Sequence, residues 1–262
     1  MNDHTFVIPA YQDSPYLEPC ILSLKNQSVK SPIIIATSTP SEYIKQIAEK
    51  YSIEVVINNT ANKGIADDWN FALAQVNTDY VTIAHQDDIY NPEFTEKSLR
   101  KLKYFKNSLI VFTDYSELLD NKLRRNSLNL FVKRLFFFPL IIRPVINVSL
   151  FKKLLLVFGN PICCPSVTYN KKNLSDFSFS DKFSYNLDWF AWYEMANKKG
   201  EFIFINQKLM KHRIHEDSET SKQLKTDGRE NEERKILVIL WGRYIGRVIY
   251  FIYSLSHKDN II

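Results

Sequence analysis

Residues 79–88 read DYVTIAHQDD, an apolar run that ends in two adjacent carboxylates. The run has the length and composition of a buried strand, and its polar residues follow at the carboxyl end. In α/β sheets, ligands bind beyond the carboxyl ends of the strands, and carboxylate oxygens placed there suit a divalent cation. A second interpretation stays open, in which Asp87 and Asp88 only cap a helix that begins at Pro92.

Short apolar runs alternate with amphipathic stretches over the first 115 residues. The runs predict strands near residues 5–9, 32–37, 53–57, 79–84 and 109–114. The stretches between them predict helices near residues 16–26, 41–51, 65–76 and 92–104. Farther along, the pattern predicts a strand near 162–169, a helix near 187–199 that stops at Gly200, and a strand at 202–205. Such alternation is typical of a mostly parallel sheet with helices on both faces.

Polar loops follow three of the predicted strands and are candidates for a ligand-binding crevice. The loops are Pro9-Ala10-Tyr11-Gln12-Asp13, Thr37-Ser38-Thr39-Pro40 and His85-Gln86-Asp87-Asp88. Because parallel strands end at the same edge of a sheet, we expect the three loops to converge on one site.

The composition is that of a globular, cytoplasmic protein. A chain of 262 residues that is 45% hydrophobic can bury a full core, so disorder of the whole chain is not expected. Cys163 and Cys164 are adjacent, a spacing that suits neither an ordinary disulfide nor a zinc site, and buried strand positions explain them better than a nucleophilic role. The first apolar run is too short for a signal peptide.

The charge distribution predicts a basic surface. The formal net charge is +5, and ten Lys or Arg residues but no acidic residue lie between Asp120 and Asp176. We interpret residues 121–160 as a basic, apolar helical insert in a domain that spans residues 1–230, with a solvated loop at 215–233. Residues 231–262 are predicted to form an amphipathic helix for membrane-surface attachment.

Two arginines decide how that last helix is interpreted. Arg243 and Arg247 lie in the middle of the apolar segment and four residues apart, which argues against a spanning helix and places both on one helical face. We therefore expect a peripheral helix on an anionic membrane surface, at the inner face of the cell membrane. The alternative is a helix that covers the core of the domain or a partner subunit.

Four motifs resemble the family 2 inverting glycosyltransferases of the GT-A type, in the family's order and over roughly residues 4–215. They are Val7-Ile8-Pro9-Ala10-Tyr11, Ser23-Leu24-Lys25-Asn26-Gln27-Ser28, Asn62-Lys63-Gly64 with Asn70 eight residues after Asn62, and His85-Gln86-Asp87-Asp88. The resemblance implies a Rossmann-like α/β fold. It also implies transfer of a sugar, with inversion, from a nucleotide diphosphate donor such as a UDP-sugar to a glycan or lipid-linked acceptor, as in the synthesis of cell-surface polysaccharides or glycoconjugates.

The resemblance assigns roles to individual residues. Donor-nucleotide contacts fall on Pro9, Ala10, Tyr11, Asp13, Thr37, Asn62, Gly64, Asn70, Gln86, Asp87 and Arg213. Ligands of Mn²⁺ or Mg²⁺ fall on Asp88 and His215. Two departures are visible: His85 stands where the family has an acid, and Thr37-Ser38-Thr39-Pro40 replaces the acidic pair that helps to read the base. The second departure weakens the argument for a uridine nucleotide, but it does not affect the argument for nucleotide binding.

Inverting transfer needs a base that removes the proton of the acceptor hydroxyl on the side opposite the phosphates. We choose Asp188, because it starts an amphipathic helix in a stretch that resembles the family's catalytic region. Trp189 is expected to contact the acceptor. The alternatives are that Asp188 only caps its helix, that Trp189 fills the core, and that residues 211–218 form an exposed polar loop.

Other functions fit the sequence less well. A sugar nucleotidyltransferase normally begins with a glycine-rich phosphate loop, and none occurs between Pro9 and Gln27. A non-catalytic module that binds a nucleotide or a lipid surface stays open. A nucleic-acid partner is not expected, because the basic residues of the middle segment lie within aliphatic runs rather than on a polar stacking platform.

Overall fold

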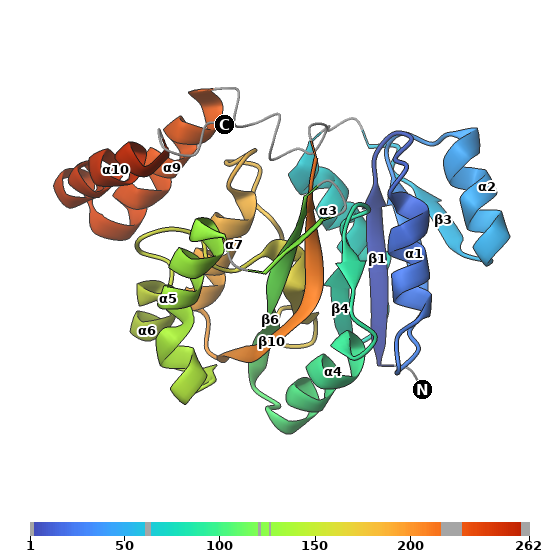
Figure 1. Cartoon of the computed structure of the whole chain (residues 1–262), viewed down its shortest axis with the longest axis horizontal. Helices are drawn as coiled ribbons and strands as arrows, with labels where there is room; N and C mark the ends of the chain where they lie inside the picture. The colour runs from blue at the N-terminus through green and yellow to red at the C-terminus, as the bar shows by residue number, and fades with distance from the viewer. Residues whose placement is uncertain (1–2, 61–63, 120–121, 126, 216–226, 258–262) are drawn as a thin grey trace.

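The computed structural model describes residues 3–60, 64–119, 122–125, 127–215 and 227–257. Their strands form one sheet in the order β3-β2-β1-β4-β9-β6-β10-β5, with β7 paired to β6 and β8 paired to β10 (Figure 1). The strands are β1 His4–Ala10, β2 Ile33–Thr37, β3 Glu54–Ile57, β4 Tyr80–Ile83, β5 Ile89–Tyr90, β6 Ser108–Leu119, β7 Lys122–Arg124, β8 Val145–Ile146, β9 Val167–Asn170 and β10 Glu201–Ile214.

The N-terminal half of the sheet is parallel, as the alternating pattern predicts. β1 pairs in parallel with β2 and with β4, and β2 pairs in parallel with β3. Beyond β4 the sheet is mixed, because β9 runs antiparallel to both β4 and β6. The result is an α/β fold whose first four strands all end at one edge, where the polar loops lie.

Helices cover both faces of the sheet and bury two separate cores. The helices are α1 Leu17–Lys25, α2 Glu42–Tyr51, α3 Ile65–Ala74, α4 Phe94–Tyr104, α5 Leu128–Ile142, α6 Ser149–Leu154, α7 Leu187–Asn197, α9 Asp227–Trp241 and α10 Arg243–His257. Alternate residues of β1 point to opposite sides: Phe6 and Ile8 pack with α1, α2 and α4, whereas Val7 packs with α3 and α7. This alternation explains why the central strand is apolar throughout.

β10 is much longer than the four residues predicted for it. Its polar second half, which begins at Asn206, has no apolar pattern, but it continues to pair with β6 after register shifts between Ile205 and Lys208 and again before Met210. The far end also pairs antiparallel with β5, directly after the acidic loop. β10 thereby carries residues 211–214 to the carboxyl end of β4.

Residues 121–160 are largely helical, as predicted, with α5 and α6 separated by the short strand β8. Leu130, Phe137 and Leu140 anchor α5 on the cores and Phe136 is half-buried, whereas Phe131, Val132, Leu135, Phe138, Ile141 and Ile142 are exposed. That this segment is an insertion in the domain stays a prediction.

The C-terminal segment differs from the single helix that the sequence predicts. α9 ends at Trp241, Gly242 adopts a φ of +78°, and α10 folds back on α9. The predicted boundary at residue 230 falls inside α9. The solvated loop predicted for residues 215–233 is wrong for its last part: Glu232 is buried and accepts backbone N–H groups of the loop before α7, at 2.7 to 3.0 Å.

Candidate active site

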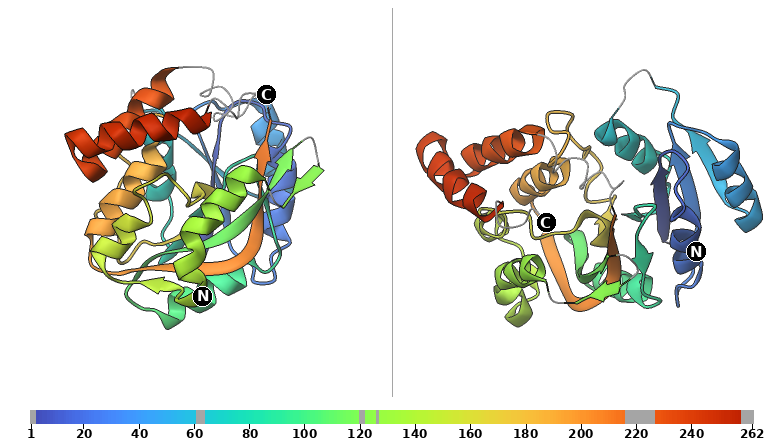
Figure 2. Two further views of the ribbon diagram at one scale, coloured as in Figure 1. Left: turned by 60° about the vertical axis from the view of Figure 1, so that its left-hand side comes forward. Right: turned by 45° about the horizontal axis from the view of Figure 1, so that its top comes forward.

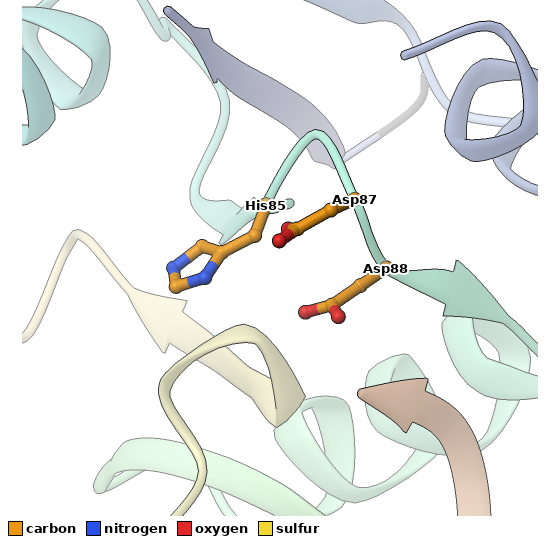
Figure 3. Close-up of side chains that lie close together, drawn as sticks. All are labelled: His85, Asp87 and Asp88. Atoms are coloured by element: carbon orange, nitrogen blue, oxygen red, sulfur yellow. The ribbon is translucent and has the colours of Figure 1, made fainter. Parts of the chain in front are cut away.

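The loop between β4 and β5 gathers three metal-binding groups. His85, Asp87 and Asp88 each offer one ligand atom, and these three atoms lie within 4.8 Å of one another. Figure 3 shows the two carboxylates side by side on this loop and the imidazole ring of His85 beside them. The apolar strand β4 is buried, so it holds the start of the loop rigidly at the edge of the sheet.

Asp88 is fully buried, and the end of β10 satisfies it. Its Oδ1 accepts the backbone N–H of Arg213 at 2.8 Å, and His212 Nδ1 lies 3.1 Å from the same oxygen. The alternative that Asp87 and Asp88 cap a helix is therefore wrong: α4 begins at Phe94, and neither carboxylate bonds its first turn. A buried carboxylate needs such partners, and β10 supplies them across more than 120 residues of chain.

Asp87 is held by the same strand end. His215 Nε2 lies 3.1 Å from Asp87 Oδ2, and Arg213 Nε donates to the Asp87 carbonyl at 2.9 Å. Burial opposes the charged carboxylate, but the hydrogen bond from His215 and the nearby imidazoles outweigh it and hold the pKa of Asp87 below its usual range. The guanidinium of Arg213 also stacks over the ring of Tyr16, 4.4 Å from its centre.

The residues of this cluster fit a divalent cation. The Nε2 atom of His85 is buried and has no hydrogen-bond partner among the described residues, so it is free to act as a ligand. Carboxylates are ligands that suit Mn²⁺ and Mg²⁺, and an imidazole nitrogen can complete a mixed donor set around a divalent transition metal. Of the two ligands predicted from the sequence, Asp88 lies in this cluster with His85 and Asp87; His215 lies 3.1 Å from Asp87, and its role as a ligand stays a prediction.

The loop after β1 meets the acidic loop, as predicted. Tyr11 and Gln86 form two reciprocal bonds, both 3.1 Å long, between the backbone of one and the side-chain amide of the other. Gln12 adopts a φ of +55°, with its N–H donated to Thr39 of the loop after β2. Asp13 accepts the hydroxyl of Ser41 at the start of α2. The predicted nucleotide-contacting residues thus come from the ends of β1 and β2 and from loops that touch; they are Pro9, Ala10, Tyr11, Asp13, Thr37, Gln86 and Asp87.

Of the predicted nucleotide contacts Asn62, Gly64 and Asn70 in the third motif, only the last two lie in the described part of the chain. Asn62 lies outside the described residues, and Gly64 precedes α3 with a φ of +147°, a conformation that favours glycine. Asn70 points elsewhere: its amide donates to the Phe179 carbonyl at 2.8 Å and accepts the Phe179 N–H at 2.7 Å. This pair of bonds ties α3 to a segment 109 residues away, so we interpret Asn70 as a structural link rather than a nucleotide contact.

Asp188 lies in the first turn of α7 and is held by two donors. Asn160 Nδ2 donates to its Oδ2 at 2.8 Å, and the Trp189 N–H donates to its Oδ1 at 2.7 Å. Burial raises the pKa of Asp188, and the two hydrogen bonds only partly oppose this effect. The residue that caps α7 is Asn186, so the carboxylate of Asp188 is not the helix cap.

The charges of three carboxylates act on the imidazole of His85. Burial lowers the pKa of His85, and the negative charges of Asp88, Asp87 and Asp188 act against that shift. Asp188 therefore lies within electrostatic reach of the acidic loop, although the two come from opposite halves of the chain. A carboxylate with a raised pKa beside a cation-binding cluster is an arrangement that active sites use.

The prediction that Trp189 contacts an acceptor is wrong. Trp189 is 1% exposed, and its indole Nε1 donates to the Leu156 carbonyl at 3.0 Å. The side chain fills the core between α7 and the segment after α6, where its one polar atom has a partner. Trp192, three residues on, is buried as well.

Three residues of the site were not predicted from the sequence. His212 contacts Asp88, Asn160 contacts Asp188, and Lys133 of α5 donates to the Tyr115 hydroxyl at 2.9 Å, beside the ring of His212. His212 directly precedes Arg213, to which the resemblance assigns a nucleotide contact, and it stands three positions before His215, the predicted metal ligand. Asn160 and Lys133 lie in residues 121–160, a segment interpreted from its overall basic and apolar character and not from single residues.

A model described as glycosyl transferase family 2 matches residues 5–165, which is more than half of the chain. The chain belongs to this family. The match confirms the family that the motifs resembled, and it favours glycosyl transfer over nucleotidyl transfer. In the described part of this glycosyltransferase, no helix has the length and hydrophobicity needed to cross a bilayer.

Solved glycosyltransferases share the fold. S. aureus TarS in complex with UDP-GlcNAc aligns with a TM-score of 0.66 at 16% identity, covering 99% of this chain and 73% of that one. Mannosyltransferase PcManGT from Pyrobaculum calidifontis, in complex with GDP-Man and Mn²⁺, gives 0.64 at 10% identity, covering 99% and 76%. Glucosyl-3-phosphoglycerate synthase from Mycobacterium tuberculosis, with Mn²⁺, UDP and glucosyl-3-phosphoglycerate, gives 0.57 at 16%, covering 81% and 72%. At these identities the likeness shows the fold, and no curated protein matches the chain.

Proposed function

We propose that this enzyme transfers a sugar, with inversion, from a nucleotide diphosphate donor to a hydroxyl acceptor, with Asp188 as the general base. One observation carries the proposal: the charges of Asp87 and Asp88 in the cation-binding cluster and that of the half-buried Asp188 all act on the imidazole of His85. The cluster is suited to the leaving diphosphate and Asp188 to the acceptor. A non-catalytic nucleotide module would have no use for the second, separately held carboxylate.

The residues divide the work as follows. His85, Asp87 and Asp88 would hold Mn²⁺ or Mg²⁺, which supplies neutralisation of the charge on the departing diphosphate. The Arg213 side chain, which lies over Tyr16 and bonds the Asp87 carbonyl, adds a fixed positive charge at the same place. The loops of β1 and β2 bind and orient the nucleotide.

Asp188 removes the proton from the acceptor hydroxyl while that oxygen forms a bond to the anomeric carbon and the bond to the diphosphate oxygen breaks. The base must be ionised when the acceptor binds, and the Asn160 amide and the Trp189 N–H both stabilise that form. Its raised pKa makes it a better proton acceptor than a solvated carboxylate.

We propose a UDP-sugar as donor, because TarS and the mycobacterial synthase were both solved with UDP or a UDP-sugar. PcManGT was solved with GDP-Man, so a guanosine donor is the alternative. We further propose a glycan or lipid-linked acceptor and a cytoplasmic location at the inner face of the cell membrane, consistent with a role in the synthesis of cell-surface polysaccharide.

A panel of nucleotide sugars tests the proposed reaction. Thermal shift with and without Mn²⁺ should show one donor class that stabilises the protein only when the cation is present. The same donor should then be hydrolysed or transferred, and proton NMR of the first product should show the anomeric configuration opposite to that of the donor. Retention of configuration would contradict the role of Asp188.

The pH dependence of transfer should reveal how Asp188 is held. Transfer needs ionised Asp188, so kcat/KM falls as the pH drops through its pKa, and the raised pKa places that fall at a higher pH than for an ordinary carboxyl. Asn160→Ala removes a donor to the ionised form, which raises the pKa further and moves the acidic limb to still higher pH. Asn197→Ala, at the far end of α7, is the matched control and should leave the profile unchanged; equal profiles for all three proteins would contradict the assignment.

A further inference from the structure

Three helices at one end of the molecule present apolar side chains outward, where a helix on a soluble domain normally has its polar face. In α5 the exposed stripe runs at spacings of three and four residues: Phe131, Leu135, Phe138 and Ile142 are 65%, 63%, 59% and 77% exposed. In α6 it consists of Leu150, Phe151 and Leu154, and in α10 of Tyr244, Ile245, Val248 and Phe251. We call these exposed apolar residues of α5, α6 and α10 the apolar face.

The stripes belong to one continuous end of the protein. In Figures 1 and 2, α5, α6, α9 and α10 gather on the side away from α2 and β3. Aromatic contacts join them, since the ring of Phe158 lies 6.2 Å from that of Phe136 in α5 and 5.5 Å from that of Trp241 in α9. Trp241 is further fixed by a hydrogen bond to the Val157 carbonyl. An exposed apolar surface of this extent marks an interaction site.

The charges carried by the helices of the apolar face are basic, while Glu230 of the neighbouring α9 accepts the Tyr250 hydroxyl of α10 at 3.2 Å. α5, α6 and α10 contain no acidic residue, and Arg143, Arg243 and Arg247 are exposed beside the stripes. A groove of about 300 Å³ between α4 and α5 has Lys97, Arg100 and Lys101 among its lining residues, opposite Leu140 and Ile141. A second copy of the chain would bring like charges together across this face, whereas an anionic surface complements it.

We propose that the apolar face docks on an anionic lipid bilayer, with the stripes of α5, α6 and α10 in the acyl boundary and the arginines at the headgroups. Helices α5 and α10 have 15 residues each, so each is about 22 Å long and too short to span a hydrocarbon core of about 30 Å. They lie on the membrane instead. The long side chains of Arg243 and Arg247 reach the headgroup layer from such a position.

The inner side of α5 connects this face to the active site. Lys133 bonds the Tyr115 hydroxyl, and Arg134 Nε lies 3.0 Å from Asp114 Oδ2. A bilayer against the outer side of α5 therefore lies about one helix diameter, on the order of 10 Å, from the groups around His212. This position suits an acceptor that is attached to a lipid. Docking itself uses none of the residues assigned to sugar transfer, so the two proposals fail independently.

Vesicle flotation with the full chain, in the absence of donor, tests the docking. The protein should float with phosphatidylcholine vesicles that contain phosphatidylglycerol and bind pure phosphatidylcholine vesicles much more weakly. Leu135→Ser with Phe138→Ser should weaken binding at least about tenfold, because both side chains lose their place in the acyl boundary. Leu22→Ser with Ile57→Ser, two exposed apolar residues at the other end of the molecule, is the matched control and should bind like the wild type.

The electrostatic part has its own pair of variants. Arg243→Gln with Arg247→Gln should weaken binding to the anionic vesicles about 30-fold, or about fivefold for each arginine near the surface. Lys45→Gln with Lys50→Gln on α2 should leave it unchanged. Wild-type protein that stays in solution with anionic vesicles would overturn the proposal. So would a wild-type dimer that Leu135→Ser with Phe138→Ser dissociates, because the face would then bind a second copy.

Discussion

Asp88→Asn is expected to abolish Mn²⁺-dependent donor binding and to lower the transfer rate about 10³-fold, because the cation supplies several kcal/mol of charge stabilisation to the leaving diphosphate. The asparagine keeps an oxygen for the backbone N–H of Arg213, so the contact between β10 and the acidic loop survives. Asp88→Ala removes that acceptor as well and should also destabilise the fold by about 1–3 kcal/mol, the cost of an unsatisfied buried group.

Calorimetric titration of Mn²⁺ into the protein, with and without nucleotide, separates the cation site from the reaction. The matched control is Asp79→Asn, an exposed acid just before β4 that should leave cation binding and transfer unchanged. If Asp88→Asn bound the cation as tightly as the wild type, the acidic loop would have only a structural role, and the proposed site would have to be abandoned.

Asp188→Asn should lower the rate of transfer by about 10²–10⁴-fold, the usual contribution of a positioned general base. Asparagine has nearly the same shape and still offers an oxygen to the Trp189 N–H, so the start of α7 should remain folded. The affinity for donor and cation should not change, because Asp188 is not among the groups that bind them. A lower kcat with an unchanged donor Kd is the signature of a group that acts only on the acceptor.

The control for this variant is Asp181→Asn, an exposed acid in the loop before α7. It removes the same charge from the same region without touching the site. Normal transfer by Asp188→Asn would exclude Asp188 as the base. In that case Glu117, a buried carboxylate of β6, would be the next residue to replace.

The first half of the fold was predictable because its signals are local. Each predicted strand and helix up to residue 104 has a matching element, and the acidic loop lies at the end of β4 as expected. The alternation of apolar and polar residues decides these elements, and neighbouring loops of a parallel sheet must meet.

The errors have a common cause, which is contact between distant parts of the chain. Nothing near Asn206 signals that β10 continues, because its second half is held by β6 and β5 rather than by its own pattern. Trp189 looked available to an acceptor, but the Leu156 carbonyl satisfies its indole and places it in the core. Asn70 matched a family position, yet Phe179 occupies both ends of its amide. The sequence around Trp189 or Asn70 does not reveal hydrogen-bond partners that lie more than 30 residues away.

The hydrogen bond between the Arg213 backbone and Asp88 also has a meaning for biosynthesis. A nascent chain emerges from the ribosome N-terminus first, so β1 to β4 leave the exit tunnel long before β10 does. Until then Asp88 has neither its backbone donor nor His212 beside it, so the acidic loop lacks the contacts that hold it in the folded enzyme. The enzyme is therefore assembled as a working catalyst only after β10 has been synthesised, and products of premature termination upstream of β10 should be inert.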